Sequence, residues 1–406
     1  MRFKKGTKRA SREDIQFIET GGICVEEVYS INFAFNNYIS FIPAQYNRGY
    51  YSYWAEGVKL MDEARWNCFV DAVSGRNEKV VVALIVDSPW IPGFCGMSHF
   101  DYYLFPDRWL EANIKVYSSY PDIIFLPGFW VEYGMATEPS AFGCKIAWSE
   151  NNTPSISPSM FDIAQVDNLQ VPRPDQDGLM PFVLHWYKWV QSVLEERNMS
   201  VKMVAARGPL ALAAHLRGTT EFLMDLKMEP ANTKKLLEIT TTTVIEWLKA
   251  QAEVLGTVEG VMVLDDIVGF LSRADYMEFA HPYLKAIFDA FPDMIKVYHN
   301  DANIAPFVDQ LPETGLDVLN FSHNLDIVEV AQKVGDRICL MGNIPPLDVL
   351  VRGDISEVKE AAIRCLNSVS DNRIRRFILS AGGGVSPDTP GENVGVLNQL
   401  VSEFNI

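Results

Sequence analysis

The feature that most constrains the fold is a series of short apolar segments, rich in β-branched residues and closed by polar residues or glycine. Such segments are typical of strands that are buried on both faces of a parallel sheet. Most of them alternate with helix-like stretches at intervals of roughly 20–35 residues, the pattern of repeated strand–loop–helix units. The segments cover residues 79–87, 122–127, 200–206, 260–264, 294–303, 318–321, 338–341 and 377–380. We therefore predict an α/β fold of the (β/α)₈ TIM barrel class.

Two parts are expected along the chain. Residues 1–78 are predicted to form a mostly helical extension that packs on the barrel, and residues 79–406 the barrel itself. A capping-box pattern at Ser11 and an aromatic stripe over residues 50–73 favour helices in the extension. Residues 144–178 are polar, proline-rich and without clear elements, which inside a compact protein is typical of a functional excursion.

Composition limits the classes of partner and compartment. The 406 residues carry a net charge of −17, which disfavours binding to nucleic acid or to an anionic membrane. No apolar run approaches the ~18 residues that span a bilayer, and the N-terminus lacks the apolar region of a signal peptide. The six cysteines form no CxxC pair, as expected for free thiols in a reducing compartment. We expect a cytoplasmic protein with a small-molecule substrate and a possible homodimeric state.

The polar end of the segment at 294–303 is the predicted chemical centre. His299 and Asp301 are two residues apart, so they lie on the same side of an extended chain. Residues at the carboxyl ends of barrel strands face the active site. We therefore predict that His299 and Asp301 are catalytic, together with Asp266, which follows the preceding strand.

The same strand ends favour a metal site. Imidazole and carboxylate groups are both zinc ligands, so His299 and Asp301 are predicted to bind the metal together with Asp265 and Glu278. Glu278 is included because it precedes His281 by three residues, which places the two on one helix face. Two alternatives remain: acid–base chemistry by His299 and an aspartate without metal, and purely structural roles as helix caps or buried hydrogen-bonding groups.

Other strand ends provide candidate substrate-binding residues. Aromatic side chains in the loops after the first two strands can stack on an aromatic ring, and ordinary packing at the barrel mouth is the alternative. Polar residues after later strands can orient a ligand. The candidates are Asp87, Trp90, Phe94, Trp130, Tyr133, Arg207, Asn320, His323 and Asn343.

These stretches resemble motifs of the uroporphyrinogen decarboxylase superfamily. The resemblance is carried, in order, by Arg-Gly-Pro from residue 207, Asp-Asp from 265, His-Asn-Asp from 299, Gly-Asn-Ile-Pro-Pro from 342, and Leu-Ser-Ala-Gly-Gly-Gly from 379. It covers about residues 200–400 and implies a (β/α)₈ barrel. Residues 1–200 match only loosely.

The resemblance implies one of two activities. The decarboxylase branch uses an arginine-rich N-terminal motif, whereas the comparable region here, residues 46–50, offers only Arg48. The other branch contains corrinoid-dependent methyltransferases, which imply zinc and a separate protein that carries a cobalamin-type corrinoid. Members acting on thiols hold zinc with His-x-Cys and a later Cys. The matching positions here are His299, Asp301 and the glycines at 382–384, so both thiolates are missing.

Oxygen ligands make a harder Lewis acid than thiolates, which favours a substrate bound through oxygen. We therefore predict an O-demethylase-type methyltransferase that moves a methyl group from an aryl methyl ether to the cobalt of a corrinoid protein. The leaving phenolate would be stabilised by zinc or by a proton donor. Two alternatives are a metal-free decarboxylase or lyase on the same barrel and a non-catalytic member that binds the corrinoid protein.

Overall fold

The computed structural model describes residues 63–403, and the contacts group residues 59–406 into one compact unit. The predicted cap at Ser11, the first part of the aromatic stripe and Arg48 lie outside the described residues. The described remainder of the stripe forms helix α1 (Glu63–Ser74), in which Trp66 and Phe69 are buried. This helix packs on strands β9 (Cys339–Ile344) and β10 (Phe377–Ala381), and the Trp66 indole N–H donates to Glu259 at 2.7 Å.

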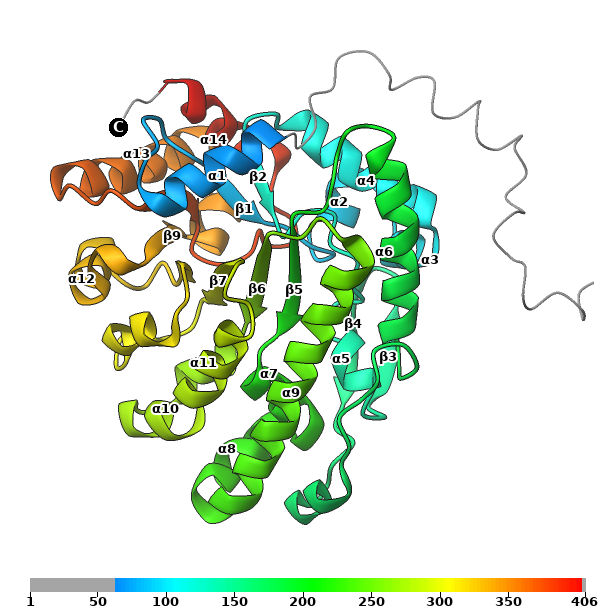
Figure 1. The fold of residues 1–406 in the computed structure, drawn as a ribbon. Helices are drawn as coiled ribbons and strands as arrows, with labels where there is room; N and C mark the ends of the chain where they lie inside the picture. The colour runs from blue at the N-terminus through cyan, green and yellow to red at the C-terminus, as the bar shows by residue number, and fades with distance from the viewer. Residues whose placement is uncertain (1–62, 404–406) are drawn as a thin grey trace, which may run out of the picture. The chain divides into compact units, whose positions relative to one another are not determined.

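Eight parallel strands form the centre of the unit (Figure 1). Six of them pair in the order β10-β9-β8-β7-β6-β5, and the remaining two, β1 and β2, pair with each other. Each of the eight apolar segments contains or overlaps one of these strands, so the predicted parallel α/β fold is confirmed. Their bounds are β1 Ala83–Ile85, β2 Ile124–Leu126, β5 Met203–Arg207, β6 Gly260–Leu264, β7 Ile295–Asn300, β8 Val318–Phe321, β9 Cys339–Ile344 and β10 Phe377–Ala381.

The two sheets are joined at one edge. A parallel bridge links Val82 to Leu379, whose N–H donates to the Val81 carbonyl at 2.9 Å. The resulting order, from β2 through β1 and β10 to β5, is the chain order expected of a barrel. Among the described residues no ladder joins β2 to β5, so the closing pair of strands is not hydrogen-bonded.

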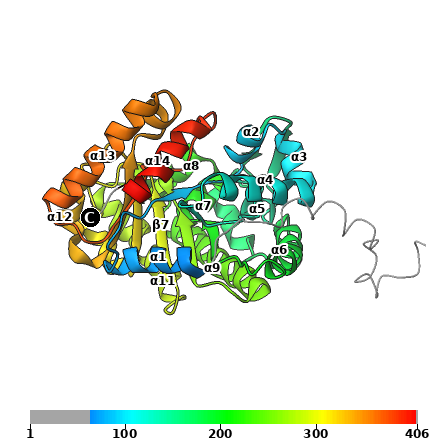
Figure 2. The ribbon, with the colours of Figure 1, turned by 90° about the horizontal axis from the view of Figure 1, so that it is seen from above.

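Helices cover the outside of the strands (Figure 2). Every residue of β1, β2, β5, β6, β8, β9 and β10 is buried, because these β-branched and apolar strands are covered on both faces. The other helices are α2 Ile91–Cys95, α3 His99–Leu104, α4 Pro106–Ser119, α5 Thr137–Ser140, α6 Met180–Glu195, α7 Pro209–Arg217, α8 Thr219–Met228, α9 Pro230–Leu255, α10 Arg273–Phe279, α11 His281–Asp289, α12 Ile327–Val334, α13 Ile355–Asp371 and α14 Gly391–Glu403.

Two predicted elements differ from the structure. The pattern over residues 273–291 predicts a single helix, which the structure breaks at Ala280, because Pro282 has no N–H to donate to the next helical hydrogen bond. The new helix α11 begins at His281. The excursion at 144–178 contains an antiparallel hairpin, β3 (Lys145–Ser149) with β4 (Asn152–Ser157). Most of its residues are exposed, so no hydrophobic alternation reveals it. The expectation that this excursion lacks elements was therefore wrong.

Two further properties of the described residues concern the length of the helices and the state of the cysteines. None of the described helices combines the length and the apolar content that crossing a membrane requires. The five described cysteines, Cys68, Cys95, Cys144, Cys339 and Cys365, are all free thiols.

Candidate metal centre and active site

Three of the predicted residues converge at the carboxyl ends of β6 and β7. One ligand atom each from Asp266, His299 and Asp301 lies within 4.8 Å of the others. The His299 Nε2 atom is 3.7 Å from Asp266 Oδ1, and the Asp301 backbone N–H donates to the same oxygen at 3.1 Å. A nitrogen and two carboxylates at this spacing form a possible metal-binding triad.

The orientation of the His299 ring is fixed by Asn320 on the neighbouring strand β8. The Asn320 side-chain NH₂ donates to the backbone carbonyls of Met341 and Ala381, at 2.9 and 3.0 Å. Its Oδ1 therefore faces His299 Nδ1, 2.7 Å away, and accepts the ring proton. In the neutral imidazole with its proton on Nδ1, the free lone pair is therefore on Nε2. The atom directed at the two carboxylates is thus the atom that can bind a metal.

The electrostatics of the triad favour a cation. Burial and the Asp266 carboxylate raise the pKa of Asp301, while His299 and His323 oppose the shift. Two neighbouring carboxylates destabilise each other's charge, and a bound cation would remove that cost. Gly383 closes one side, because a Cβ built there would lie 3.0 Å from Asp301 Oδ2. The glycine loop at 382–384 therefore reaches the centre, as the motif comparison implied, without contributing a side chain.

Asp265, a predicted metal ligand, is not part of this group. Its carboxylate is buried and caps helix α7, accepting the N–H groups of Leu210 at 2.9 Å and Ala211 at 2.8 Å. Burial raises the pKa of Asp265 to about 8, although these hydrogen bonds oppose the shift. Gly208 makes room for the carboxylate, since a Cβ there would lie 2.4 Å from it. Neighbouring residues of an extended chain point in opposite directions, which separates Asp265 from Asp266.

Glu278, the other predicted ligand, also lies outside the triad. It is on the exposed side of α10, where its carboxylate pairs with Lys234 Nζ at 2.7 Å. Half of its side chain is exposed to solvent. The structure therefore brings together Asp266, His299 and Asp301, and leaves Glu278 in a surface ion pair.

A second acidic group lies after strands β1 and β2. Burial raises the pKa of Asp87 to about 6, and the charges of Arg207 and His299 oppose that shift. Burial and the neighbouring Asp87 raise the pKa of Glu132 to about 7. The Glu132 carboxylate accepts the Ser88 N–H at 3.1 Å and also the Gly134 N–H. Two neighbouring carboxyl groups with raised pKa values hold a proton near neutral pH.

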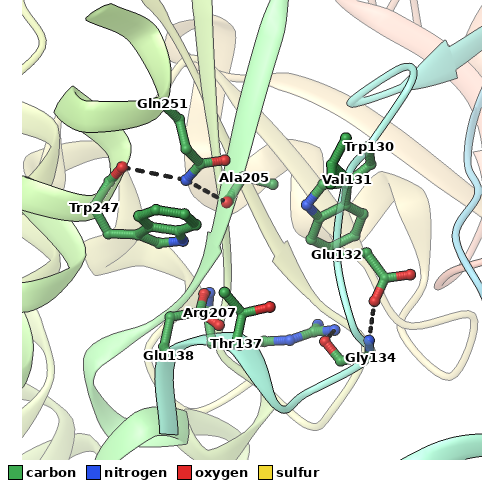
Figure 3. Close-up of a pocket in the computed structure, with 10 residues that line it drawn as sticks. All are labelled: Trp130, Val131, Glu132, Gly134, Thr137, Glu138, Ala205, Arg207, Trp247 and Gln251. Carbon is green, nitrogen blue, oxygen red and sulfur yellow. Dashed lines mark hydrogen bonds between the residues drawn. The ribbon is translucent and has the colours of Figure 1, made fainter. Parts of the chain in front are cut away.

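Arg207, at the end of β5, is the predicted cationic residue of the site. Its guanidinium lies 5.5 Å from the centre of the Trp130 ring, and its backbone N–H donates to Glu138 at 3.0 Å. These groups border a cavity of about 10 Å³ between β5 and the segment after β2 (Figure 3). A cavity of this size holds about one water molecule. Arg207 is therefore buried beside the seam between β2 and β5.

The predicted aromatic residues fall into two separate clusters. Trp90 and Phe94 stack at 4.7 Å, and the Trp90 indole N–H donates to the Thr389 carbonyl at 2.9 Å. This first cluster is internal packing of helix α2. Tyr133 instead lies 5.6 Å from Tyr103 and 5.9 Å from Trp148 of the hairpin strand β3. Trp148 of the second cluster is 42% exposed, whereas Trp90 is buried and Phe94 partly buried.

His323 lies in the loop after β8, and Asn343 lies against that loop. The Asn343 side-chain NH₂ donates to the carbonyls of Ser322 and Leu325, at 3.3 and 2.7 Å, and so holds the loop after β8. The backbone of His323, in that loop, packs closely on Gly382. Asn343 therefore positions a loop and does not point at the triad.

Sequence reasoning missed Glu132, Glu138 and Tyr103. Glu132 and Glu138 both follow predicted strand β2 and are buried, and the rule that selected Asp266 would have selected them too. Tyr103 lies in helix α3, where its hydroxyl donates to Ser88 at 2.7 Å. Nothing in the helical pattern distinguishes such a residue from the core.

Comparison with known proteins places the chain among curated relatives. A protein named uroporphyrinogen decarboxylase from Chlorobium phaeobacteroides is 24% identical over 276 residues, which cover 66% of this chain and 76% of the relative. The protein of the same name from Aliivibrio salmonicida is 25% identical over 291 residues, with the same coverage.

A solved structure described as a methyltransferase from Methanosarcina mazei shares the fold. It superposes with a TM-score of 0.72 at 20% identity, over 84% of this chain and 98% of that one. The family model for uroporphyrinogen decarboxylase (URO-D) matches residues 94–404, which is more than half of the chain. The resemblance seen in the motifs is thus confirmed: the chain belongs to the uroporphyrinogen decarboxylase family.

Proposed function

We propose that this chain is a corrinoid-dependent methyltransferase that takes a methyl group from an O-methylated donor, of the aryl methyl ether class, and passes it to the cobalt of a separate corrinoid protein. The observation that carries the proposal is the donor set at the ends of β6 and β7. It contains the Nε2 atom of His299 and the carboxylates of Asp266 and Asp301, and no cysteine sulfur from residues 63–403.

The residues present fit a zinc ion. The free lone pair of His299 is directed at two carboxylates, and Asn320 fixes the ring in the manner typical of zinc-binding histidines. Zinc bound by these three side chains would act as a Lewis acid toward the ether oxygen and its leaving phenolate. Nitrogen and oxygen ligands without sulfur favour an oxygen substrate over a thiol.

The proposed reaction balances without an external oxidant. The nucleophile is Co(I), which attacks the methyl carbon and supplies the electron pair of the new cobalt–carbon bond. The carbon–oxygen bond breaks and its electron pair stays on oxygen, which gives a phenolate and methyl-Co(III). The proton held by Asp87 and Glu132 supports a further role, protonation of the leaving oxygen from the acidic group after β1 and β2.

The second aromatic cluster supports an aryl donor. Tyr103, Tyr133 and Trp148 gather near the acidic group, because Tyr103 donates to Ser88 and Ser88 also donates to Glu132. An aromatic ring stacked or packed edge-on against such side chains gains roughly 0.5–1.5 kcal/mol per pair beyond its buried area.

Anaerobic incubation with 2-methoxyphenol and cob(I)alamin tests the proposal. Formation of methylcobalamin, followed by its absorbance, is expected with the zinc-loaded protein. His299→Ala and Asp301→Asn should abolish it, and Asp289→Asn, in a surface ion pair with Lys285, should not. Full activity after complete metal removal would overturn the zinc role. The absence of transfer from every methylated oxygen, nitrogen and sulfur donor tried would overturn the methyltransferase.

Decarboxylation of a polycarboxylated tetrapyrrole is the second candidate, because the curated relatives are named uroporphyrinogen decarboxylases. A substrate with many carboxylates requires several cations, and Arg207 lies instead among Asp87, Glu132 and Glu138. That acidic surrounding disfavours such a substrate. Release of carbon dioxide from uroporphyrinogen by the metal-free protein would support this candidate.

A further inference from the structure

A groove borders the triad on its outer side, between the loops that follow β7 and β8. It has a volume of about 370 Å³ and is lined by Asp301, Ala302, Asn303, Ser322, Asn324 and Leu325. None of these residues is aromatic or basic. The groove therefore offers neutral polar groups beside one carboxylate of the triad.

Both walls of the groove are held in place from outside it. The Asp301 N–H donates to Asp266, and Ala302 packs so closely on Gly269 that a Cβ there would lie 2.3 Å from the alanine Cβ. The opposite wall is fixed by Asn343, which donates to the carbonyls of Ser322 and Leu325. A ligand entering between two fixed walls meets groups that are already positioned.

The two exposed asparagines present complementary atoms. Asn303 Oδ1 accepts the Ala305 N–H at 3.2 Å, which leaves its Nδ2 as a donor. Asn324 Nδ2 donates to Ser322 Oγ at 3.3 Å, which leaves its Oδ1 as an acceptor. No hydrogen bond within residues 63–403 uses either of these two remaining atoms. One donor and one acceptor on facing walls match a primary carboxamide, which both accepts and donates.

We propose that this groove binds the carboxamide-bearing edge of the corrin ring, with Asn303 donating to an amide oxygen and Asn324 accepting an amide N–H. The inference rests on the proposed methyl transfer to a corrinoid. A corrin carries primary amide side chains around its rim, so its edge has the required chemistry. The volume is at the lower end for small-molecule pockets, which suits one edge of a large ring whose remainder stays outside.

The aromatic cluster and the groove would bind the two substrates at separate places. The aromatic cluster lies after β1 and β2, whereas the groove lies after β7 and β8, four positions away in the order of the eight strands. The triad is at the ends of β6 and β7, next to the groove. A donor ring on the aromatic side and a corrin edge on the amide side would bring the methyl group and the cobalt together near the triad.

Equilibrium dialysis of the zinc-loaded full chain against methylcobalamin tests the inference without turnover. Each neutral hydrogen bond contributes about 1 kcal/mol, so Asn303→Leu and Asn324→Leu should each raise Kd about fivefold. Asn367→Leu, at an exposed position of α13, is the matched control and should leave Kd unchanged. Zinc content should be the same in all variants. Unchanged Kd in the double variant, or no binding to the unmodified protein, would overturn the inference.

Two further measurements test which asparagine donates the hydrogen bond and which part of the corrinoid is bound. Asn303→Asp removes the donor and should weaken binding, whereas Asn324→Asp keeps the acceptor and should not. Cobinamide, which retains the rim amides and lacks the nucleotide tail, should show the same fold-changes as methylcobalamin. If the variants change the Kd of methylcobalamin but not that of cobinamide, the groove binds the nucleotide tail. That result would overturn the inference that it binds the edge of the corrin ring. Groove-dependent binding without any donor demethylation would instead overturn the proposed function.

Discussion

Asn320 Oδ1 lies 2.7 Å from His299 Nδ1, and the direction of this hydrogen bond is set by two backbone carbonyls on the far side of the amide. The asparagine acts on the metal only through the imidazole. It is a positioning residue, and its effect can be separated from that of the ligands.

Asn320→Leu should weaken zinc binding by about 10- to 100-fold, because the imidazole loses the acceptor that fixes its tautomer. Competition with a chromophoric chelator measures the zinc Kd directly. Asn393→Leu is the control: Asn393 is also buried and also donates to two backbone carbonyls, those of Leu350 and Gly353, but far along the chain from the triad. Equal loss of zinc affinity in both variants would show that general destabilisation causes the effect.

The raised pKa of Glu132 predicts how the free energy of unfolding depends on pH. An unfolded glutamate loses its proton near pH 4.5, whereas the folded protein retains it until about 7. Between these values the folded state binds more protons, so the free energy of unfolding falls as pH rises, by up to about 3 kcal/mol. Urea unfolding at pH 5 and pH 8 measures the difference.

Glu132→Gln should reduce this pH dependence, because glutamine does not titrate. Glu360→Gln on α13, where the carboxylate is exposed near Arg364, should leave it as in the unmodified protein. An unchanged slope in the Glu132 variant would mean that this carboxyl is not protonated in the folded protein at neutral pH.

Gly208→Ala should destabilise the fold by about 1–3 kcal/mol, because the new methyl group would overlap the buried Asp265 carboxylate that caps α7. The backbone there is extended, with φ −71°, so the cost is steric contact alone. Thermal unfolding provides the measurement. Gly93→Ala, with no atom within 4 Å of the added carbon, should be nearly neutral. Unchanged stability of Gly208→Ala would mean that the Asp265 carboxylate moves away from the added methyl group without destabilising the fold.

Trp148→Ala should raise the KM for an aryl donor by about 2- to 10-fold, because one edge-on aromatic partner of Tyr103 and Tyr133 is lost. The KM for cob(I)alamin should not change, since the groove lies on the other side of the triad. Steady-state kinetics with each substrate varied in turn give both values. Phe182→Ala, at an exposed position of α6, should change neither. A raised KM for both substrates would argue against separate sites.

Much of the fold follows from the sequence, because buried parallel strands have continuous apolar sequences. The runs that became β6 and β8 were located to the residue. The hairpin of β3 and β4 could not be found, because its strands are mostly exposed and their residues do not alternate. The break at Ala280 is marked in the sequence by Pro282, because proline cannot donate a helical hydrogen bond.

The site was predictable where a side chain follows a strand directly. His299, Asp301 and Asp266 come together because period-2 geometry and strand order both apply. The sequence could not decide between Asp265 and Asp266, since that choice depends on which one meets the N-terminus of α7. Side chains in loops follow no fixed period, so the sequence does not separate Trp90 from Tyr133.

The unpaired seam between β2 and β5 has a mechanical consequence. Backbone ladders resist sliding and widening, whereas the contacts around Arg207, Trp130 and Glu138 depend on side chains that can rearrange. Elastic compliance of the strand assembly should therefore concentrate along this line. When a bulky substrate enters, the strands should yield there first, while the register that aligns His299 with Asn320 is preserved.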